Sequence, residues 1–252
     1  MTAGNSSPSG MGGNLKIAII GYGKMGKAIE AIATEDGHEV VLKIDIDNAD
    51  ELTSENLKRS DVAIEFTTPG TAVNNILQCF DAGVPVVCGT TGWLERLEEV
   101  KQICKQKNGT FLSTTNFSIG VNIFFEINKY AAALMNSHKE YNVSIEETHH
   151  TQKKDAPSGT AITLAEQILA QTEIKTRWVN NTTDNVNELE IVSKRIDPAA
   201  GIHKVKYSSA VDDIEIIHTA HNRHGFAKGA LLAAAFIKDK KGIFTMQEVL
   251  GF

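Results

Sequence analysis

The sequence predicts an α/β protein in which a Rossmann-like, doubly wound parallel sheet is followed by a second α+β domain built on a mixed four-stranded sheet. From Leu15 to about Asn116, short and wholly apolar runs alternate with helical patterns, as they do where helices cover both faces of a parallel sheet. Beyond Asn116 the runs alternate apolar and polar residues, the pattern of strands with one solvated face. A glycine-rich loop, GYGKMG, lies between the first predicted strand and the first predicted helix, which is typical of dinucleotide-binding folds.

The first domain is predicted from its apolar runs. Its strands are LKIAIIG, VVLKIDI, DVAIEF, VPVVCG and TFLSTT, and its helices span residues 24–34, 70–82 and 94–107. Parallel strands need long crossover connections, and helices of this length supply them. The repeated alternation of strand and helix therefore predicts a parallel sheet.

The second domain is predicted from the change in pattern. Its strands span residues 141–147, 188–196, 203–208 and 213–218, and its helices span about 119–135 and 159–171. The polar, asparagine-rich segment TRWVNNTTDNVNE, residues 176–188, is expected to be a loop. The run GALLAAAFI, residues 229–237, is apolar on nearly every side of a helix, so we expect it to be buried against the first domain.

These patterns divide the chain into four segments. We expect a flexible leader, a dinucleotide-binding domain, a second domain and a C-terminal return to the first domain, spanning residues 1–13, 14–116, 117–226 and 227–252. The leader lacks the charged and apolar regions of a signal peptide.

Composition limits the classes of partner. The 252-residue chain has a formal net charge of -6, which argues against general binding to nucleic acid or to anionic membranes. The apolar run ALLAAAFI near the C-terminus is far shorter than the roughly 20 residues of a membrane span. Three cysteines without CxxC spacing indicate neither a disulfide framework nor a zinc ribbon. We therefore expect a cytoplasmic protein that acts on a small molecule, with no nucleic-acid or membrane partner.

The glycine loop, residues 21–26, predicts a dinucleotide site. Gly21 permits a tight turn, Gly23 lets a pyrophosphate approach the main chain, and Gly26 allows the helix to pack closely on the strand. Asp45 follows the second strand 19 residues after Gly26, where a carboxylate can accept hydrogen bonds from the adenosine ribose. The alternative interpretation is a glycine turn beside an unrelated surface aspartate.

Asp45 also bears on the choice between NADH and NADPH. A carboxylate repels the 2′-phosphate of NADPH, and the next residue is Ile46 rather than an arginine, so NADH is favoured. Lys24 and Lys27 in the glycine loop could reach a 2′-phosphate, which leaves NADPH open.

Two further loops follow predicted strands at the edge where doubly wound sheets bind ligands. CGTTGW, residues 88–93, offers small residues and hydroxyls beside a nicotinamide, and TTNFSIG, residues 114–120, leads into the second domain. Either loop could instead be a simple strand-to-helix turn.

The segment ETHHTQKKDAPSGTA, residues 147–161, concentrates proton donors and positive charge. We expect the strand to end just before the histidine pair and a helix to begin after the loop. The N–H groups of Gly159 and Thr160 at that helix start can bind a carboxylate, and Lys153 adds a full charge. A histidine beside these groups can give or take a proton near neutral pH. The segment therefore predicts a site for an anionic substrate that accepts a hydride and a proton.

The basic segments also allow other interpretations. Adjacent histidines seldom bind one metal ion together and no cysteine lies nearby, so we predict no metal. The loop could also be a solvated surface on which the lysines face water. A second basic cluster, residues 218–229, includes Arg223, for which a structural role at the return to the first domain is favoured over substrate binding.

Together these motifs resemble those of the dihydrodipicolinate reductases (4-hydroxy-tetrahydrodipicolinate reductases). The resemblance runs from Lys16 to the C-terminus through GYGKMG, IEFTTP, CGTTG, TNFSIGVN, ETHHTQKKDAPSGTA and RHGFAKGALLAAAFI. It implies NAD(P)H-dependent reduction of a cyclic dicarboxylate, made from aspartate semialdehyde and pyruvate, to tetrahydrodipicolinate in lysine and diaminopimelate synthesis. It also implies that the second domain binds the substrate and assembles a homotetramer through its sheet.

The resemblance implies a role for each matching site residue. His149 matches the family's proton donor or acceptor, and Lys153 matches its second proton donor. The substrate carboxylate site matches His150, Gly159 and Thr160. The cofactor site matches four stretches of the chain: Gly21, Tyr22, Gly23, Lys24, Met25, Gly26, Asp45, Gly89, Thr90, Thr91, Thr114, Thr115, Asn116 and Phe117.

Two other functions share parts of this pattern. A two-domain dehydrogenase of aspartate-derived metabolites, such as a homoserine or L-aspartate dehydrogenase, would share the nucleotide domain but not DAPSGTA. A non-catalytic NAD-sensing regulator would keep the glycine loop without a reason for His149 and Lys153.

Overall fold

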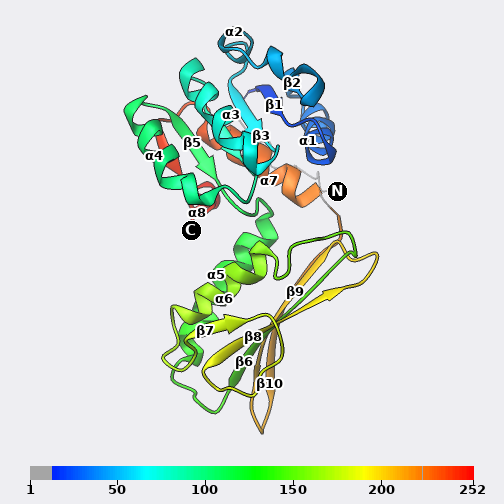
Figure 1. Ribbon diagram of the computed structural model, residues 1–252, viewed down its shortest axis with the longest axis vertical. Coiled ribbons are helices and arrows are strands. Elements are labelled where there is room, and N and C mark those ends of the chain that lie inside the picture. The colour runs from blue at the N-terminus through cyan, green and yellow to red at the C-terminus, as the bar shows by residue number, and fades with distance from the viewer. Residues whose placement is uncertain (1–12, 223) are drawn as a thin grey trace, which may run out of the picture. The chain divides into compact units, whose positions relative to one another are not determined.

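The computed structural model describes residues 13–222 and 224–252, which form two compact units (Figure 1). The first unit comprises the described residues up to Thr114 together with Ala227–Phe252, and the second unit comprises the described residues of Thr115–Phe226. Residues 1–12 of the expected leader, and Arg223, lie outside the described residues. Each unit has its own sheet and its own hydrophobic core.

A six-stranded parallel sheet forms the centre of the first unit, in the order β11-β5-β4-β3-β1-β2. The strands are β1 (Lys16–Ile20), β2 (Glu39–Ile44), β3 (Val62–Glu65), β4 (Val86–Cys88), β5 (Thr110–Ser113) and β11 (Gly242–Phe244). The strand order reverses between β1 and β3, so the loops after these two strands diverge and leave a crevice at their carboxyl ends. The predicted doubly wound sheet is confirmed.

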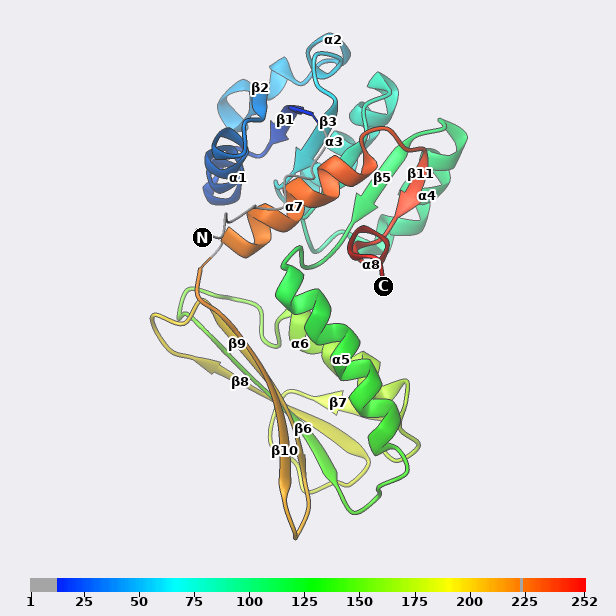
Figure 2. The same ribbon diagram turned by 180° about the vertical axis from the view of Figure 1, so that it is seen from behind.

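Helices cover both faces of this sheet, as its wholly buried central strands require. α3 (Pro69–Ala82) and α4 (Leu97–Gln106) lie on one face, and α1 (Lys24–Glu35) and α7 (His224–Ile237) lie on the other (Figures 1 and 2). The shorter helices α2 and α8 and two 3-10 turns complete the unit, at Ser54–Leu57, Met246–Leu250, Ile46–Glu51 and Leu94–Arg96. The three free cysteines are all buried in this unit.

The second unit is built on a mixed sheet in the order β10-β9-β6-β8-β7. Its strands are β6 (Asn142–His149), β7 (Arg177–Val179), β8 (Glu188–Arg195), β9 (Gly201–Ser208) and β10 (Asp213–Ala220). β6 pairs parallel with β8 and antiparallel with β9. α5 (Ile119–Met135) and α6 (Gly159–Leu169) pack against each other and share one core with the inner face of this sheet (Figure 2).

Several elements differ from the sequence-based expectation. The second sheet has five strands rather than four, because β7 lies within the segment expected to be a loop. β11 was not predicted, and α7 begins at His224, five residues before the predicted start. β7 and β11 have only three residues each, too few to show a period, so tertiary pairing decides them. No helix among the described residues is long and apolar enough to cross a bilayer.

Candidate active site

The inner face of β6 changes from apolar to polar along the strand. Burial alternates strictly, so Val143 and Ile145 point into the core and the next two inward positions are Glu147 and His149. The strand continues through His149, two residues beyond its expected end. Because side chains two apart share a face, the same alternation that builds the core also buries a carboxylate and an imidazole.

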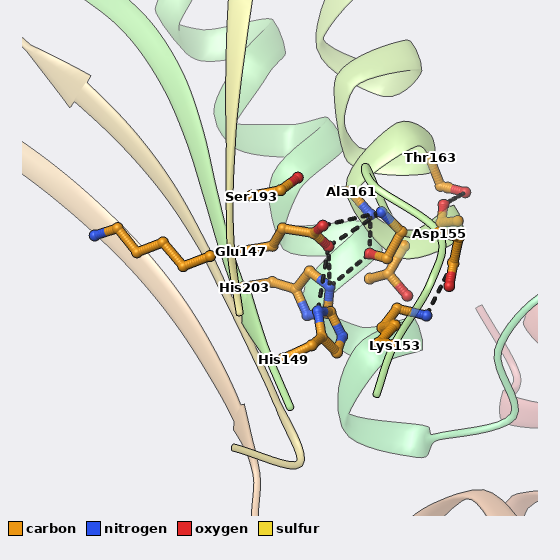
Figure 3. Close-up of polar contacts among 12 residues, drawn as sticks. Glu147, His149, Lys153, Asp155, Ala161, Thr163, Ser193 and His203 are labelled. Carbon is orange, nitrogen blue, oxygen red and sulfur yellow. Dashed lines mark hydrogen bonds and ion pairs between the residues drawn. The ribbon is translucent and has the colours of Figure 1, made fainter. Parts of the chain in front are cut away.

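Neighbouring strands add partners for these two side chains. His203 on β9 and Ser193 on β8 stand opposite Glu147, and Arg195 on β8 stands opposite His149. The cluster is buried: Glu147, His149 and His203 are 0%, 7% and 4% exposed. Figure 3 shows the two histidine rings and the Glu147 carboxylate turned toward one another below the start of α6.

The Glu147 carboxylate links the sheet to that helix. Ser158, the N-cap of α6, donates its backbone N–H to both carboxylate oxygens at 3.1 and 3.2 Å. Arg195 lies 3.4 Å from Oε1, while His149 Nδ1 and His203 Nε2 lie 3.4 and 3.7 Å from Oε2. The Ser158 hydroxyl in turn lies 3.1 Å from His203 Nε2. Buried charge of this kind persists only where it is paired and hydrogen-bonded.

Burial and charge pairing shift the pKa values of Glu147 and His149 in different ways. Burial would raise the pKa of the Glu147 carboxyl, but the neighbouring polar groups of His203, Ser158 and Ser193 outweigh it and hold that pKa well below its usual range. Burial lowers the pKa of His149 to about 4, and neighbouring cationic groups act in the same direction against the Glu147 charge. At neutral pH the cluster therefore holds an ionised Glu147 and an uncharged His149.

We expect the protein to lose stability as the pH falls from about 6.5 to about 4. The pKa of His149 is lower in the folded chain than in the unfolded chain, so only the unfolded chain binds this proton over that interval, and stability rises with pH. At about 1.4 kcal/mol per pKa unit, the effect of this one group is at most about 3.5 kcal/mol. Glu147, whose pKa is depressed, adds a loss of the same sign at still lower pH.

Urea unfolding at a series of pH values tests this expectation. The slope of the free energy of unfolding against pH should be positive in the wild type and shallower in His149→Gln. Equal slopes in the two proteins would show that this histidine does not govern the acid sensitivity.

Arg195 also shapes the loop that carries Lys153. Its guanidinium donates to the backbone carbonyls of Lys153, at 3.2 Å, and of Asp155. The Lys153 ammonium forms an ion pair with the Asp155 carboxylate at 2.9 Å, close to His149 (Figure 3). The lysine, the histidine and the start of α6 are thus gathered on one side of the second unit, as the sequence motif suggested.

The start of α6 offers N–H groups as predicted. Gly159 and Thr160 are its first helical residues, whose N–H groups have no acceptor within the helix. A Cβ built on Gly159 would meet no atom within 4 Å, so a ligand can approach the main chain there. The Thr160 hydroxyl accepts a hydrogen bond from Asn116 at 3.1 Å. His150 lies just beyond β6 and is half-buried, outside the contacts of the Glu147 carboxylate.

Glu147, His149 and His203 hold potential ligand atoms within 4.8 Å of one another, a spacing that would suit a metal ion. The carboxylate oxygens already accept from Ser158 and face the Arg195 guanidinium. An added cation would meet that positive charge at close range. We therefore interpret the group as a network of hydrogen bonds and charges rather than a metal centre.

The glycine loop of the first unit is built for close approach. Gly21 has φ +97°, and a Cβ there would lie 2.0 Å from the Phe66 carbonyl oxygen. A Cβ on Gly26 would lie 2.4 Å from the Gly21 oxygen and 3.1 Å from Ile19, so α1 packs tightly against β1. Gly23 caps α1 and faces open space, which leaves the helix N-terminus accessible to a phosphate.

A cavity of about 340 Å³ opens beside this loop at the carboxyl ends of the strands. Six residues of the predicted cofactor set line it, together with Phe66, Thr67 and Pro69: Gly23, Lys24, Met25, Gly89, Thr90 and Thr91. The position matches the crevice expected where the strand order reverses. Its residues fit a dinucleotide, because glycine backbone and a helix N-terminus meet there.

The other predicted cofactor residues lie outside that lining. The N–H groups of Gly21 and Tyr22 donate to the Ile44 carbonyl at 2.9 and 3.0 Å, which places the following residue, Asp45, beside the glycine loop. Asp45 is exposed and caps the 3-10 turn, with Oδ1 accepting from the Ile46 N–H at 2.9 Å.

The loop after β5 has structural contacts of its own. Thr114 donates its N–H to the Cys88 carbonyl at 3.3 Å, and the Asn116 side chain accepts from the Ser118 N–H at 2.8 Å. Phe117 is 2% exposed. Thr114, Thr115, Asn116 and Phe117 are not among the residues that line the 340 Å³ cavity.

The sequence of the chain matches two family models. The model described as dihydrodipicolinate reductase, N-terminus, matches residues 15–117, and the model described as dihydrodipicolinate reductase, C-terminus, matches residues 120–250. This chain belongs to the dihydrodipicolinate reductase family. The assignment made from the motifs is confirmed, and with it the oxidoreductase class and a nicotinamide cofactor.

Individual members of the dihydrodipicolinate reductase family resemble this chain over nearly its whole length. The 4-hydroxy-tetrahydrodipicolinate reductase of Christiangramia forsetii is 47% identical over 94% of this chain and 98% of its own length. That of Methanocorpusculum labreanum is 35% identical over 94% of this chain and 99% of its own. A dipicolinate-bound dihydrodipicolinate reductase from a Paenisporosarcina species shares the fold, with a TM-score of 0.75 and 23% identity over 94% of this chain and 99% of that one.

Sequence reasoning missed three members of this reductase's buried cluster: Glu147, Arg195 and His203. The signal was present, because Glu147 continues the inward positions of Val143 and Ile145. In β9, His203 likewise continues the inward series with Val205. A buried position in a strand pattern that carries an ionisable residue is a candidate for function.

Proposed function

We propose that this chain catalyses the NAD(P)H-dependent reduction of 4-hydroxy-tetrahydrodipicolinate, or of its dehydrated form dihydrodipicolinate, to tetrahydrodipicolinate in lysine and diaminopimelate synthesis. Membership of the dihydrodipicolinate reductase family supports this function. The structural observation that carries it is the buried His149, held beside Lys153 and the N-terminus of α6.

The chain's own residues divide the work of binding a dianion and moving a proton. Lys153 and the N–H groups of Gly159 and Thr160 bind the substrate carboxylates, with His150 as a further partner. When bound, the reduced nicotinamide supplies a hydride to C4 of the substrate ring. The arriving negative charge of the substrate raises the pKa of His149 from its low resting value. His149 can then take a proton from solvent and deliver it at C3.

A related protein supports the substrate class. The Paenisporosarcina reductase, which shares this fold, has been solved with dipicolinate bound. Dipicolinate is a planar ring with two carboxylates, so it has the charge that Lys153 and the start of α6 are suited to bind.

A coupled assay tests the proposed function. Aspartate semialdehyde and pyruvate are supplied with dihydrodipicolinate synthase, and loss of reduced-nicotinamide absorbance is followed after adding this protein. We expect turnover that depends on all components, and no comparable turnover with homoserine or L-aspartate and the oxidised cofactor. Activity on either amino acid alone would favour another dehydrogenase, and binding of cofactor without any turnover would favour an NAD-sensing regulator.

We further propose that NADH is bound at least as tightly as NADPH, because Asp45 places a carboxylate where the 2′-phosphate would lie. We expect Asp45→Asn to raise the affinity for NADPH relative to NADH. Asparagine is as good an N-cap as aspartate, so the 3-10 turn that Asp45 caps is retained. Asp50→Asn, in the same exposed turn, is the matched control.

Fluorescence titration of each variant with both reduced cofactors measures this preference. Markedly tighter binding of NADPH by the wild type would overturn the proposed preference. The role of Asp45 itself would be refuted if Asp45→Asn and Asp50→Asn changed the affinity ratio equally.

We also propose a homotetramer assembled through the second sheet, in the cytoplasm. The edge strand β10 leaves Ile214 and Ile217 45% and 54% exposed, and apolar side chains on a sheet edge favour contact with another chain. Light scattering on the purified protein should give four times the monomer mass, and Ile217→Lys should lower it.

A further inference from the structure

We propose that Glu147 is a positioning residue for His149: its buried carboxylate, shared with His203, fixes the ring orientation and the tautomer of the histidine so that Nε2 is the nitrogen that takes up and delivers the proton. This inference rests on the proposed function, which makes His149 the proton-transfer group, and adds a residue that does not touch the substrate.

The carboxylate makes more contacts than a structural link requires. The Ser158 N–H and the Arg195 guanidinium already tie β6 to α6 and to β8. The second oxygen also faces two imidazole nitrogens, His149 Nδ1 at 3.4 Å and His203 Nε2 at 3.7 Å. Since the Glu147 side chain is fully buried, water does not screen these interactions.

The surroundings of His149 select one tautomer. Its Nδ1 is buried and has no hydrogen-bond partner in this conformation, and the Glu147 carboxylate is the negative charge nearest to it. A proton on Nδ1 is therefore attracted to Glu147, which leaves the lone pair on Nε2. Hydrogen bonds of this kind are often long before a substrate binds and shorten in the complex.

The opposite side of the ring is shaped by a glycine. A Cβ on Gly201, at the start of β9, would lie 3.2 Å from His149 Nε2 and 3.4 Å from Cδ2. The absence of that Cβ gives the imidazole space at the nitrogen that must exchange a proton. The His203 ring, 5.0 Å away and at 72° to it, closes a further side, so the His149 ring has little freedom to turn over.

The charges that face His149 come from every neighbouring element: Glu147 on β6, Arg195 on β8, His203 on β9 and Lys153 in the following loop. Glu147 is the one negative group among them, and it favours the protonated imidazole. Removing its charge should therefore make His149 harder to protonate, a change that loss of a packing contact would not produce.

Glu147→Gln tests the inference, because glutamine keeps an oxygen that can accept from Ser158 while the charge is lost. We expect kcat to fall by at least about 10-fold, the lower end of the loss seen when the hydrogen-bonded partner of a metal-bound histidine is removed. The KM for the cofactor should not change. Glu146→Gln is the matched control, since Glu146 is the preceding residue and pairs with Lys194 at 2.6 Å on the outer face of the sheet.

Two readouts separate positioning from a merely structural role. In NMR titration, the pKa of the His149 imidazole should fall in Glu147→Gln and stay at its wild-type value in Glu146→Gln. In the His149→Gln background, adding Glu147→Gln should cause little further loss of kcat, because the residue acts through the histidine. The inference is overturned if Glu147→Gln folds with wild-type kcat and an unchanged His149 pKa. It is also overturned if the fold-loss of kcat in the double variant equals the product of the fold-losses in the two single variants.

Failure of the proposed function would look different, since the wild type itself would then not turn over the substrate while the NMR titration still tests the Glu147–His149 coupling. If Glu147→Gln does not fold, Glu147→Asp replaces it. Aspartate keeps the charge, but its side chain is one methylene shorter, so the carboxylate lies farther from His149. We therefore expect a kcat between those of the wild type and His149→Gln. Wild-type kcat with a wild-type His149 pKa in that variant would equally overturn the inference.

Discussion

Replacing His149 with glutamine should lower kcat by about 10²- to 10⁴-fold, the range that a positioned general acid or base contributes. Glutamine approximates the size and polarity of the imidazole but cannot take up or release a proton near neutral pH. The cofactor should bind as in the wild type, because His149 belongs to the second unit and the cavity of the glycine loop belongs to the first. The coupled assay gives kcat, and cofactor titration gives the Kd.

A surface histidine provides the control for this substitution. The His138 side chain is exposed and pairs with Glu140 at 3.4 Å, so His138→Gln should leave kcat and the Kd of the cofactor unchanged. If His149→Gln were as active as His138→Gln, proton transfer by His149 would be ruled out. A loss of cofactor affinity equal to the loss of kcat would point instead to a disturbed fold.

Replacing Lys153 with alanine should damage both substrate binding and turnover. A hydrogen bond to a charged partner contributes about 1.5–3 kcal/mol, and about 1.4 kcal/mol corresponds to a factor of ten. We therefore expect kcat/KM for the dicarboxylate to fall by at least about 10-fold from binding alone. If the ammonium also assists proton transfer, as the family resemblance implies, kcat itself falls as well.

The adjacent lysine serves as the matched control for Lys153. Lys154 is exposed, so Lys154→Ala removes the same charge from the same loop without removing the group near His149. Steady-state kinetics at varied substrate, together with competition by dipicolinate, measure the two effects. Equal kinetics in the two alanine variants would mean that the loop contributes only general positive charge.

Before substrate binds, the Lys153 ammonium is paired with the Asp155 carboxylate at 2.9 Å. A substrate carboxylate must therefore compete with that aspartate. Asp155 is exposed and Lys153 is partly exposed, and an ion pair open to solvent contributes little net stability. The pair therefore holds the ammonium near the site at small cost to binding. The Arg195 guanidinium holds the same loop in place by donating hydrogen bonds to the backbone carbonyls of Lys153 and Asp155.

A part of the molecule was predictable from sequence when neighbouring residues along the chain determine it, and was missed when contacts between distant segments determine it. Gly21 and Gly26 were assigned roles from sequence, and the structure gives them those roles, because a turn and a close approach of helix to strand are decided within a few residues. The parallel sheet was likewise readable from short, wholly apolar runs. β7 and β11 were missed because three residues carry no period and pairing with a neighbour decides their state.

By itself, the sequence determined the fold class, the glycine loop and the reductase family, and it singled out the segment that we propose carries the chemistry, since all of these reside in contiguous motifs. Only the tertiary structure decided that His149 is uncharged at rest and that Glu147, Arg195 and His203 surround it. The physical reason is that burial and charge pairing depend on strands 46 to 56 residues apart in the chain, from His149 to Arg195 and from Glu147 to His203, being brought side by side. No local pattern encodes that proximity.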